Sequence, residues 1–191
     1  MKKLLIAAAL ATAFTGVTAQ AESVSTASSG TITFNGQLTS STCKVNVNGS
    51  GNSDGNVDLP VLQKTALPSQ GATAGDTTFN MLLTDCTLAD GMTAVSAYFE
   101  DGVTVNPYGR LINQSKATET SNVTLELLDR TQSNANVITI GSNSQIKNAI
   151  YETVKDNAAT LNYSVRYYAE EKDGASAGMV SSSVVYALQY K

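Results

Sequence analysis

Near the start of the chain, every second residue belongs to one face of small or apolar side chains, and the residues between them are small or polar. The face consists of Val24, Thr26, Ser28, Gly30, Ile32, Phe34, Gly36 and Leu38. A period of two describes an extended strand with one face made for burial. A strand at a free chain end can leave its own domain and pair with another chain. The segment is therefore either the first strand of its own domain or a strand donated to a neighbour.

The residues before this face have the order of a secretory signal peptide. Lys2 and Lys3 precede an apolar run over 4–14, and Ala19-Gln20-Ala21 forms a small-x-small cleavage site. The run is shorter than the roughly 20 residues that a membrane-spanning helix needs. We predict a signal peptide over 1–21, cleavage after Ala21, and export of the mature chain.

Cys43 and Cys86 are the only two cysteines in the sequence. Export takes them to an oxidising compartment, which favours a disulfide over two free thiols or half of a metal site. A disulfide closing a loop of this length would stabilise the domain by roughly 4 kcal/mol in the chain-entropy model.

Composition gives little support to catalysis or to nucleic-acid binding. After cleavage the chain has 10 basic and 16 acidic side chains, a formal charge of −6, and it contains no histidine. A negative charge disfavours nucleic-acid binding. Histidine, the missing residue, is the commonest general base and a common zinc ligand. We expect no cofactor, no metal and no catalytic residue. The carboxylates that could act in pairs are Asp85, Asp90, Glu100, Asp101, Glu119, Glu126 and Asp129.

Short alternating runs bounded by Gly, Asn, Asp or Ser follow one another to the C-terminus. They predict strands at 43–47, 79–83, 95–99, 123–127, 137–140, 161–167 and 180–190, with an edge strand at 57–62 around Pro60 and a loop at 70–76. Apolar residues at helical spacing between 143 and 157 leave a short helix or a loop open there. The pattern predicts one all-β domain, a sandwich or a barrel.

Six motifs, in order, resemble those of subunits of chaperone–usher fimbriae, in particular the type 1 major pilins of Gram-negative bacteria. The opening is Gly30-Thr-Ile-Thr-Phe-Asn-Gly-Gln-Leu before Cys43, and the next is Phe79-x-Met81-x-Leu83-Thr-Asp-Cys86. Further matches are Val123-x-Leu125-x-Leu127-Leu-Asp129, Ile138-Thr-Ile-Gly141 and Leu161-Asn-Tyr163-x-Val165-x-Tyr167-x-Ala169. The sixth pairs the penultimate Tyr190 with Gly178, fourteenth from the end.

This resemblance implies an incomplete immunoglobulin-like Greek-key sandwich that lacks its last strand, completed by a donor strand from a neighbouring subunit. The donor extension is expected over 22–35, with Val24, Ser28, Gly30, Ile32 and Phe34 directed at the neighbour's groove. The pilin domain is expected over 36–191, with Leu38 in its own first strand. The acceptor groove and chaperone contact are expected at Gly178, Val184, Tyr186, Leu188, Tyr190 and Lys191.

The resemblance also implies the partners and the location. The partners are identical or related pilin subunits in a linear polymer, a periplasmic chaperone, an outer-membrane usher and a host receptor reached through a tip adhesin. The destination is a fimbrium at the cell surface. A minor adaptor or tip subunit with a binding role is the alternative to a structural shaft subunit.

Overall fold

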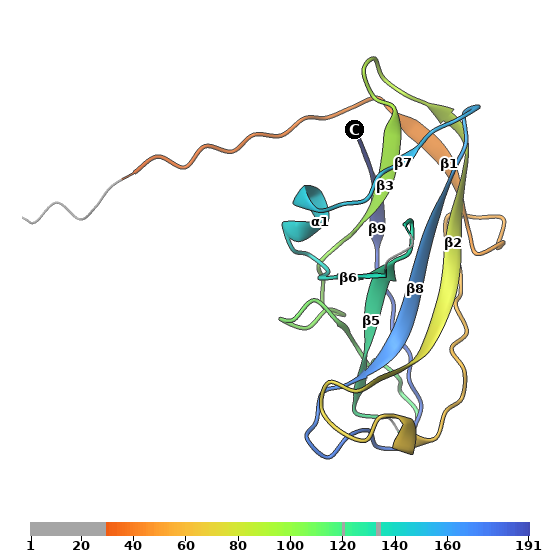
Figure 1. Ribbon diagram of the computed structural model, residues 1–191, viewed down its shortest axis with the longest axis vertical. Helices are drawn as coiled ribbons and strands as arrows, with labels where there is room; N and C mark the ends of the chain where they lie inside the picture. The colour runs from red at the N-terminus through yellow and green to blue at the C-terminus, as the bar shows by residue number, and fades with distance from the viewer. Residues whose placement is uncertain (1–29, 120, 133–134) are drawn as a thin grey trace, which may run out of the picture. The chain divides into compact units, whose positions relative to one another are not determined.

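The computed structural model describes residues 30–119, 121–132 and 135–191 (Figure 1). The chain divides into two units, Met1–Gln37 and Leu38–Lys191. The expected signal peptide, Val24 and Ser28 lie outside the described residues. From 30 to 37 the chain has no regular secondary structure and its side chains are exposed. The strands and helices described below all belong to the second unit.

Two antiparallel sheets form the second unit. The larger has the order β1-β2-β8-β5-β4, with β6 also pairing with β5, and the smaller has the order β7-β3-β9 (Figure 1). The larger sheet contains β1 (Thr42–Val47), β2 (Thr73–Thr87), β4 (Leu111–Ile112), β5 (Val123–Asp129), β6 (Asn136–Ile138) and β8 (Ala159–Ala169). The smaller contains β3 (Ala94–Phe99), β7 (Glu152–Thr153) and β9 (Tyr186–Tyr190). The described part of the second unit also contains two single-turn helices, the 3-10 helix η1 (Lys64–Ala66) and α1 (Ser144–Lys147).

The core lies between the two sheets and follows the predicted alternation. Leu83 on β2, Val95 on β3 and Leu161 on β8 have no exposed surface. Tyr163 on β8 joins the layers, because its ring lies 5.2 Å edge-on from that of Phe99 and its hydroxyl accepts the N–H of Ala97 at 3.1 Å. Burial raises the pKa of this phenol to about 12. The predicted all-β sandwich is confirmed.

A bulge near the end of β2 lets the two cysteines meet. Simple alternation after Leu83 would direct residue 85 inward and Cys86 outward. Asp85 instead adopts a positive φ of 50°, and the pairing of β1 with β2 shifts register between Thr42 and Lys44. Cys86 thereby becomes buried, and its sulfur bonds to that of Cys43. The predicted disulfide is confirmed.

β7 pairs only with Ala94 and Val95, and at the other end of β3 a side chain bonds the main chain on that edge. The amide of Gln145, in α1, accepts from the N–H of Phe99 and donates to its carbonyl, each at 2.9 Å. An unpaired strand edge can pair with another chain, and the Gln145 bonds occupy the main-chain groups of Phe99 at this edge of β3. Of the segment 143–157, only four residues form the helix, and 152–153 form β7 instead.

Four sequence predictions differ from the structure. The segment 57–62 is no strand, and of 180–190 only the last five residues form one. β2 begins at Thr73, inside the predicted loop. Leu38 is fully exposed four residues before β1 instead of packing in a first strand. Residues 57–62 and 180–185 pair with no strand in the described part of the chain.

Candidate functional site

A groove of about 1040 Å³ opens between two extended segments of the second unit. We call residues 53–64 its first wall and residues 175–186 its second wall. The core between the sheets supplies its floor, with Phe79, Met81, Leu125, Leu127 and Val165 among the lining side chains. This volume is at the upper limit of small-molecule pockets, which occupy roughly 300–1,000 Å³. Its elongated walls and apolar floor are suited to an extended peptide.

A row of main-chain N–H groups on each wall lacks hydrogen-bond partners among the described residues. Within the described residues, none of the N–H groups of 53–62 or 182–185 donates a hydrogen bond. Val57, Leu59 and Val184 on these walls are half-buried against the core. The hydroxyl of Ser182 is buried and makes no hydrogen bond. A buried polar group without a partner costs about 1–3 kcal/mol, so the groove is unsatisfied while it is empty.

The structure places the residues expected at the acceptor side on one face. Val184, Tyr186, Leu188 and Tyr190 are all half-buried and pack against the core cluster, and the first two also line the groove. Gly178 lies on the second wall with a φ of 148°, a conformation that favours glycine. The roles assigned to these residues remain predictions.

The C-terminal residue pairs with the smaller sheet. The main-chain oxygen of Lys191 accepts the N–H groups of Thr93 at 2.7 Å and Ala94 at 3.0 Å, and its own N–H donates to Ala94. Within the described residues, the terminal strand β9 pairs with one strand, β3, along one of its edges.

The exposed end of the alternating segment carries apolar side chains on one face. Ile32 is 77% exposed and Phe34 is 89% exposed, and both belong to the first unit. Leu38, which continues the same alternation, is 100% exposed at the start of the second unit. Exposed apolar side chains that follow the period of a strand mark a surface made for a partner.

Comparison with known proteins finds fimbrial subunits. The family model for "Type-1 fimbrial protein, A" matches residues 59–191. The chain is 39% identical to the major fimbrial subunit SMF-1 of Stenotrophomonas maltophilia over 166 residues, covering 86% of this chain and 94% of the relative. The chain belongs to the type-1 fimbrial protein family. It is a structural fimbrial subunit that is exported to the cell surface and polymerises with other subunits of its kind.

Other relatives of this fimbrial subunit agree. It is 31% identical to the F17 fimbrial protein of Escherichia coli over 179 residues, covering 92% of this chain and 96% of the relative. Its fold is similar to the P pilus rod subunit PapA, with a TM-score of 0.54 and 16% identity over 78% of this chain and 99% of the other. A chain in the structure of a chaperone–usher pilus has a TM-score of 0.56 and 16% identity over 86% and 96% of the two chains. The relatives match a structural subunit and give no support to a tip or adaptor role.

No helix in the described part of the fimbrial subunit combines the length and apolar character needed to cross a bilayer. Across the ranges that the structure covers, its Cys, Asp and Glu side chains form no group of three that could hold a metal ion. Asp85 pairs with Lys44 at 2.8 Å on the surface. Burial raises the pKa of the Asp129 carboxyl. The N–H of Thr131 donates a hydrogen bond to this carboxyl at 2.8 Å, which partly offsets that rise.

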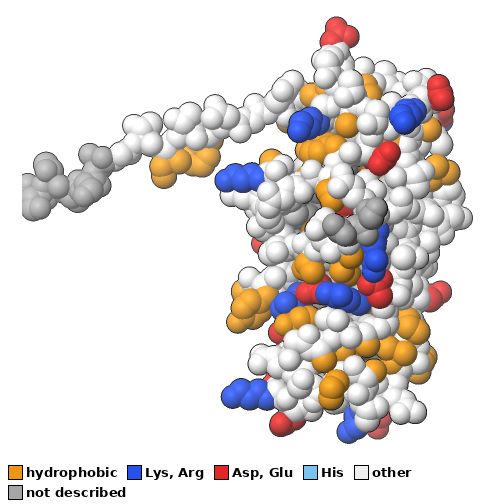
Figure 2. Space-filling model, viewed as in Figure 1, with side chains coloured by type: hydrophobic (Ala, Val, Ile, Leu, Met, Phe, Trp, Pro, Cys, Tyr) orange, Lys and Arg blue, Asp and Glu red, His pale blue; other side chains and the backbone are white. Residues whose placement is uncertain are grey.

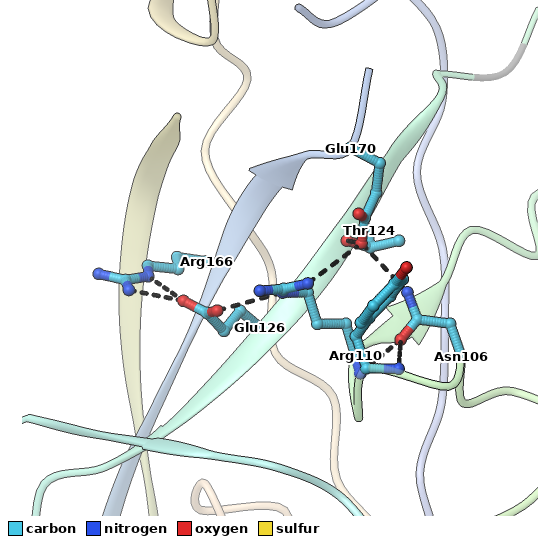
Figure 3. Close-up of polar contacts among 7 residues, drawn as sticks. Asn106, Arg110, Thr124, Glu126, Arg166 and Glu170 are labelled. Carbon is cyan, nitrogen blue, oxygen red and sulfur yellow. Dashed lines mark hydrogen bonds and ion pairs between the residues drawn. The ribbon is translucent and has the colours of Figure 1, made fainter. Parts of the chain in front are cut away.

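Glu126 lies at the centre of an ionic cluster on the outer face of the larger sheet (Figure 3). Its carboxylate accepts Arg110 Nε at 3.2 Å and Arg166 Nε at 2.9 Å, and its side chain is only 4% exposed. Arg110 also lies 3.5 Å from Glu170 and stacks over the Tyr168 ring at 3.5 Å. Figure 2 shows basic and acidic side chains gathered over the middle of this sheet. The two arginines and two glutamates balance in charge, and their ion pairs link β5 and β8 to each other and to Arg110, the residue before β4.

Replacing Glu126 with glutamine is expected to destabilise the domain by about 3 kcal/mol, because two guanidinium groups would then face a neutral amide in a partly buried site. Urea unfolding of the mature chain measures the loss. Glu119→Gln, at an exposed acid with no side-chain hydrogen bond among the described residues, is the matched control and should change stability little. Equal losses in the two variants would contradict a stabilising role for the cluster.

Sequence reasoning missed half of the groove. It assigned the second wall but interpreted 57–62 as an edge strand and gave the first wall no role. It placed Tyr167 in a strand but gave it no role at the groove, where its hydroxyl bonds the carbonyl of Pro60 at 3.2 Å. It also gave no role to Ser182, whose buried hydroxyl has no partner among the described residues. The proline within an alternating apolar run was the available signal, because such a segment cannot enter a central ladder.

Proposed function

We propose that the groove is the acceptor site for a donor strand supplied by the N-terminal extension of another subunit. The observation that carries this proposal is the state of the two walls: extended, with unpaired N–H groups, on either side of an apolar floor and a buried hydroxyl without a partner. An added strand would pair with both walls and cover the floor. A small ligand could not satisfy a row of main-chain groups along both sides.

The extension of this chain has the complementary features. Its expected donor residues over 22–35 include Ile32 and Phe34, and Leu38 is available on the same face because its side chain is fully exposed. Fully burying an isoleucine or phenylalanine side chain contributes about 1.5–3 kcal/mol. Repetition of this exchange, each subunit donating to one neighbour and accepting from another, gives a linear polymer joined without covalent bonds.

An open groove of this kind needs temporary cover before assembly, since exposed apolar surface and unpaired edges promote aggregation. We assign this cover to a periplasmic chaperone that contacts the second wall, β9 and the carboxylate of Lys191. An outer-membrane usher then presents the next subunit's extension. A host receptor is reached through a tip adhesin, and the role of this chain is structural rather than catalytic.

A truncated subunit tests the proposal. A chain of residues 36–191 should accept a donor strand but be unable to supply one. Mixed with the mature chain, it is expected to shorten fibres in proportion to its share of the mixture, and alone it should form none. Fibre lengths are measured by electron microscopy. Fibres of normal length from the truncated chain alone would overturn the proposal.

A further inference from the structure

A tyrosine hydroxyl joins the two walls of the empty groove. Tyr186, the first residue of β9, donates its hydroxyl to the carbonyl of Ser53 at 2.8 Å, so a residue of the second wall bonds directly to the first. Burial, and next the nearby carboxylate of Asp54, raise the pKa of this phenol. The hydroxyl therefore stays protonated at neutral pH and remains a donor.

Side chains provide the hydrogen bonds that hold the first wall. Its N–H groups from 53 to 62 donate no bond in the described ranges, and its carbonyls accept from side chains. Asn48 bonds the carbonyl of Asn56 at 3.0 Å, and Tyr167 on β8 bonds that of Pro60. Among these bonds, that of Tyr186 is the one that comes from the second wall.

A strand inserted between the walls would compete with this bond for space. Paired strands lie about 4.8 Å apart, so an inserted strand that pairs with both walls fills a gap of roughly twice that distance. The Tyr186 side chain extends from the second wall to the carbonyl of Ser53 on the first, and so lies across that gap. The side chains of the strand that point into the groove also need space beside Tyr186.

We propose that the Tyr186 hydroxyl is a latch that holds the empty groove closed and is released when a donor strand enters. This inference rests on the proposed function, because it concerns the regulation of the same acceptor site. The latch slows donor entry without contributing to the stability of the filled groove. In the empty subunit, the hydroxyl is a hydrogen-bond partner for the carbonyl of Ser53, which would otherwise stay unpaired until a donor strand arrives.

Tyr186→Phe tests the latch, because it removes the hydroxyl and keeps the ring. The probe is a fluorescent synthetic peptide of residues 22–38, added in excess to the mature chain and followed by stopped-flow anisotropy. Losing one neutral hydrogen bond changes a rate or equilibrium constant by about two- to tenfold. We therefore expect the association rate constant to rise by that factor. The dissociation rate constant should stay the same. The thermal midpoint should fall for the empty variant and stay constant for the peptide-filled one.

Tyr98→Phe is the matched control, since Tyr98 is a half-buried tyrosine on β3 whose hydroxyl forms no hydrogen bond with any described residue. It should leave both rate constants unchanged. An unchanged association rate constant for Tyr186→Phe, an equal rise in dissociation, or failure of this variant to fold would each overturn the latch. Failure of the peptide to bind any of the three proteins would instead overturn the proposed function.

Discussion

A subunit carrying both Ile32→Asp and Phe34→Asp is expected to fold, form its disulfide and yet assemble no fibres. Each replaced side chain loses about 1.5–3 kcal/mol of burial in the neighbour's groove. The two losses together weaken the junction between subunits by roughly a hundredfold to ten-thousandfold. The aspartates add the cost of taking charge out of water into an apolar site. Electron microscopy and size-exclusion chromatography measure the loss of polymer.

The alternation of the segment provides the control for this prediction. Thr31→Asp with Thr33→Asp introduces the same two charges into the same stretch of chain, on the face opposite to Ile32 and Phe34. This variant should still assemble, because its carboxylates point away from the groove. Normal fibres from the Ile32 and Phe34 variant, or equal loss in both variants, would show that the apolar face does not enter a neighbour.

Strands that have both a regular period and a partner were predictable from the sequence. The alternation of Leu161, Tyr163 and Val165 places them in the core because β8 lies between β2 and β5. Two-residue strands were not predictable. β4 and β7 exist because the long strands beside them position two residues to bond, and such short runs carry no period of their own.

The groove could be predicted on one side only, for a physical reason. Apolar alternation reports which side chains face the core, and it is the same whether or not the main chain has a neighbour. The runs at 57–62 and 180–185 therefore resemble strands, although neither pairs with a strand among the described residues. An extended segment without a paired strand and a strand within a sheet have the same sequence pattern. The main-chain hydrogen bonds distinguish them.

Side-chain bonds that replace strand pairing were also beyond the sequence. Gln145 closes the edge of β3 and Tyr186 crosses the groove, each through main-chain groups distant in the chain. Neither residue type is unusual at its position, and only the packing of the two sheets brings the partners together. The ionic cluster around Glu126 is similar, since its members come from β5, β8 and the residues before β4.

Removing the disulfide is expected to have the largest effect on stability. Cys43 and Cys86 are separated by 43 residues, and closing such a loop restricts the unfolded chain by an amount equivalent to about 4 kcal/mol. That is a large part of the 5–15 kcal/mol that stabilises a typical domain. β1 depends on this link more than the other long strands, because it pairs with β2 alone at the edge of the larger sheet.

The variant Cys43→Ala with Cys86→Ala should therefore unfold at a much lower urea concentration than the oxidised mature chain, and reduced wild type should match it. Thr42→Ala with Thr87→Ala is the matched control, since these exposed residues pair across the same two strands without a covalent bond. A loss in the control equal to that in the cysteine variant would mean that the pairing of β1 and β2 matters and the covalent link does not. A β1 that detaches without its disulfide would also loosen Val47, which lines the groove, so the cysteine variant should bind the donor peptide less tightly.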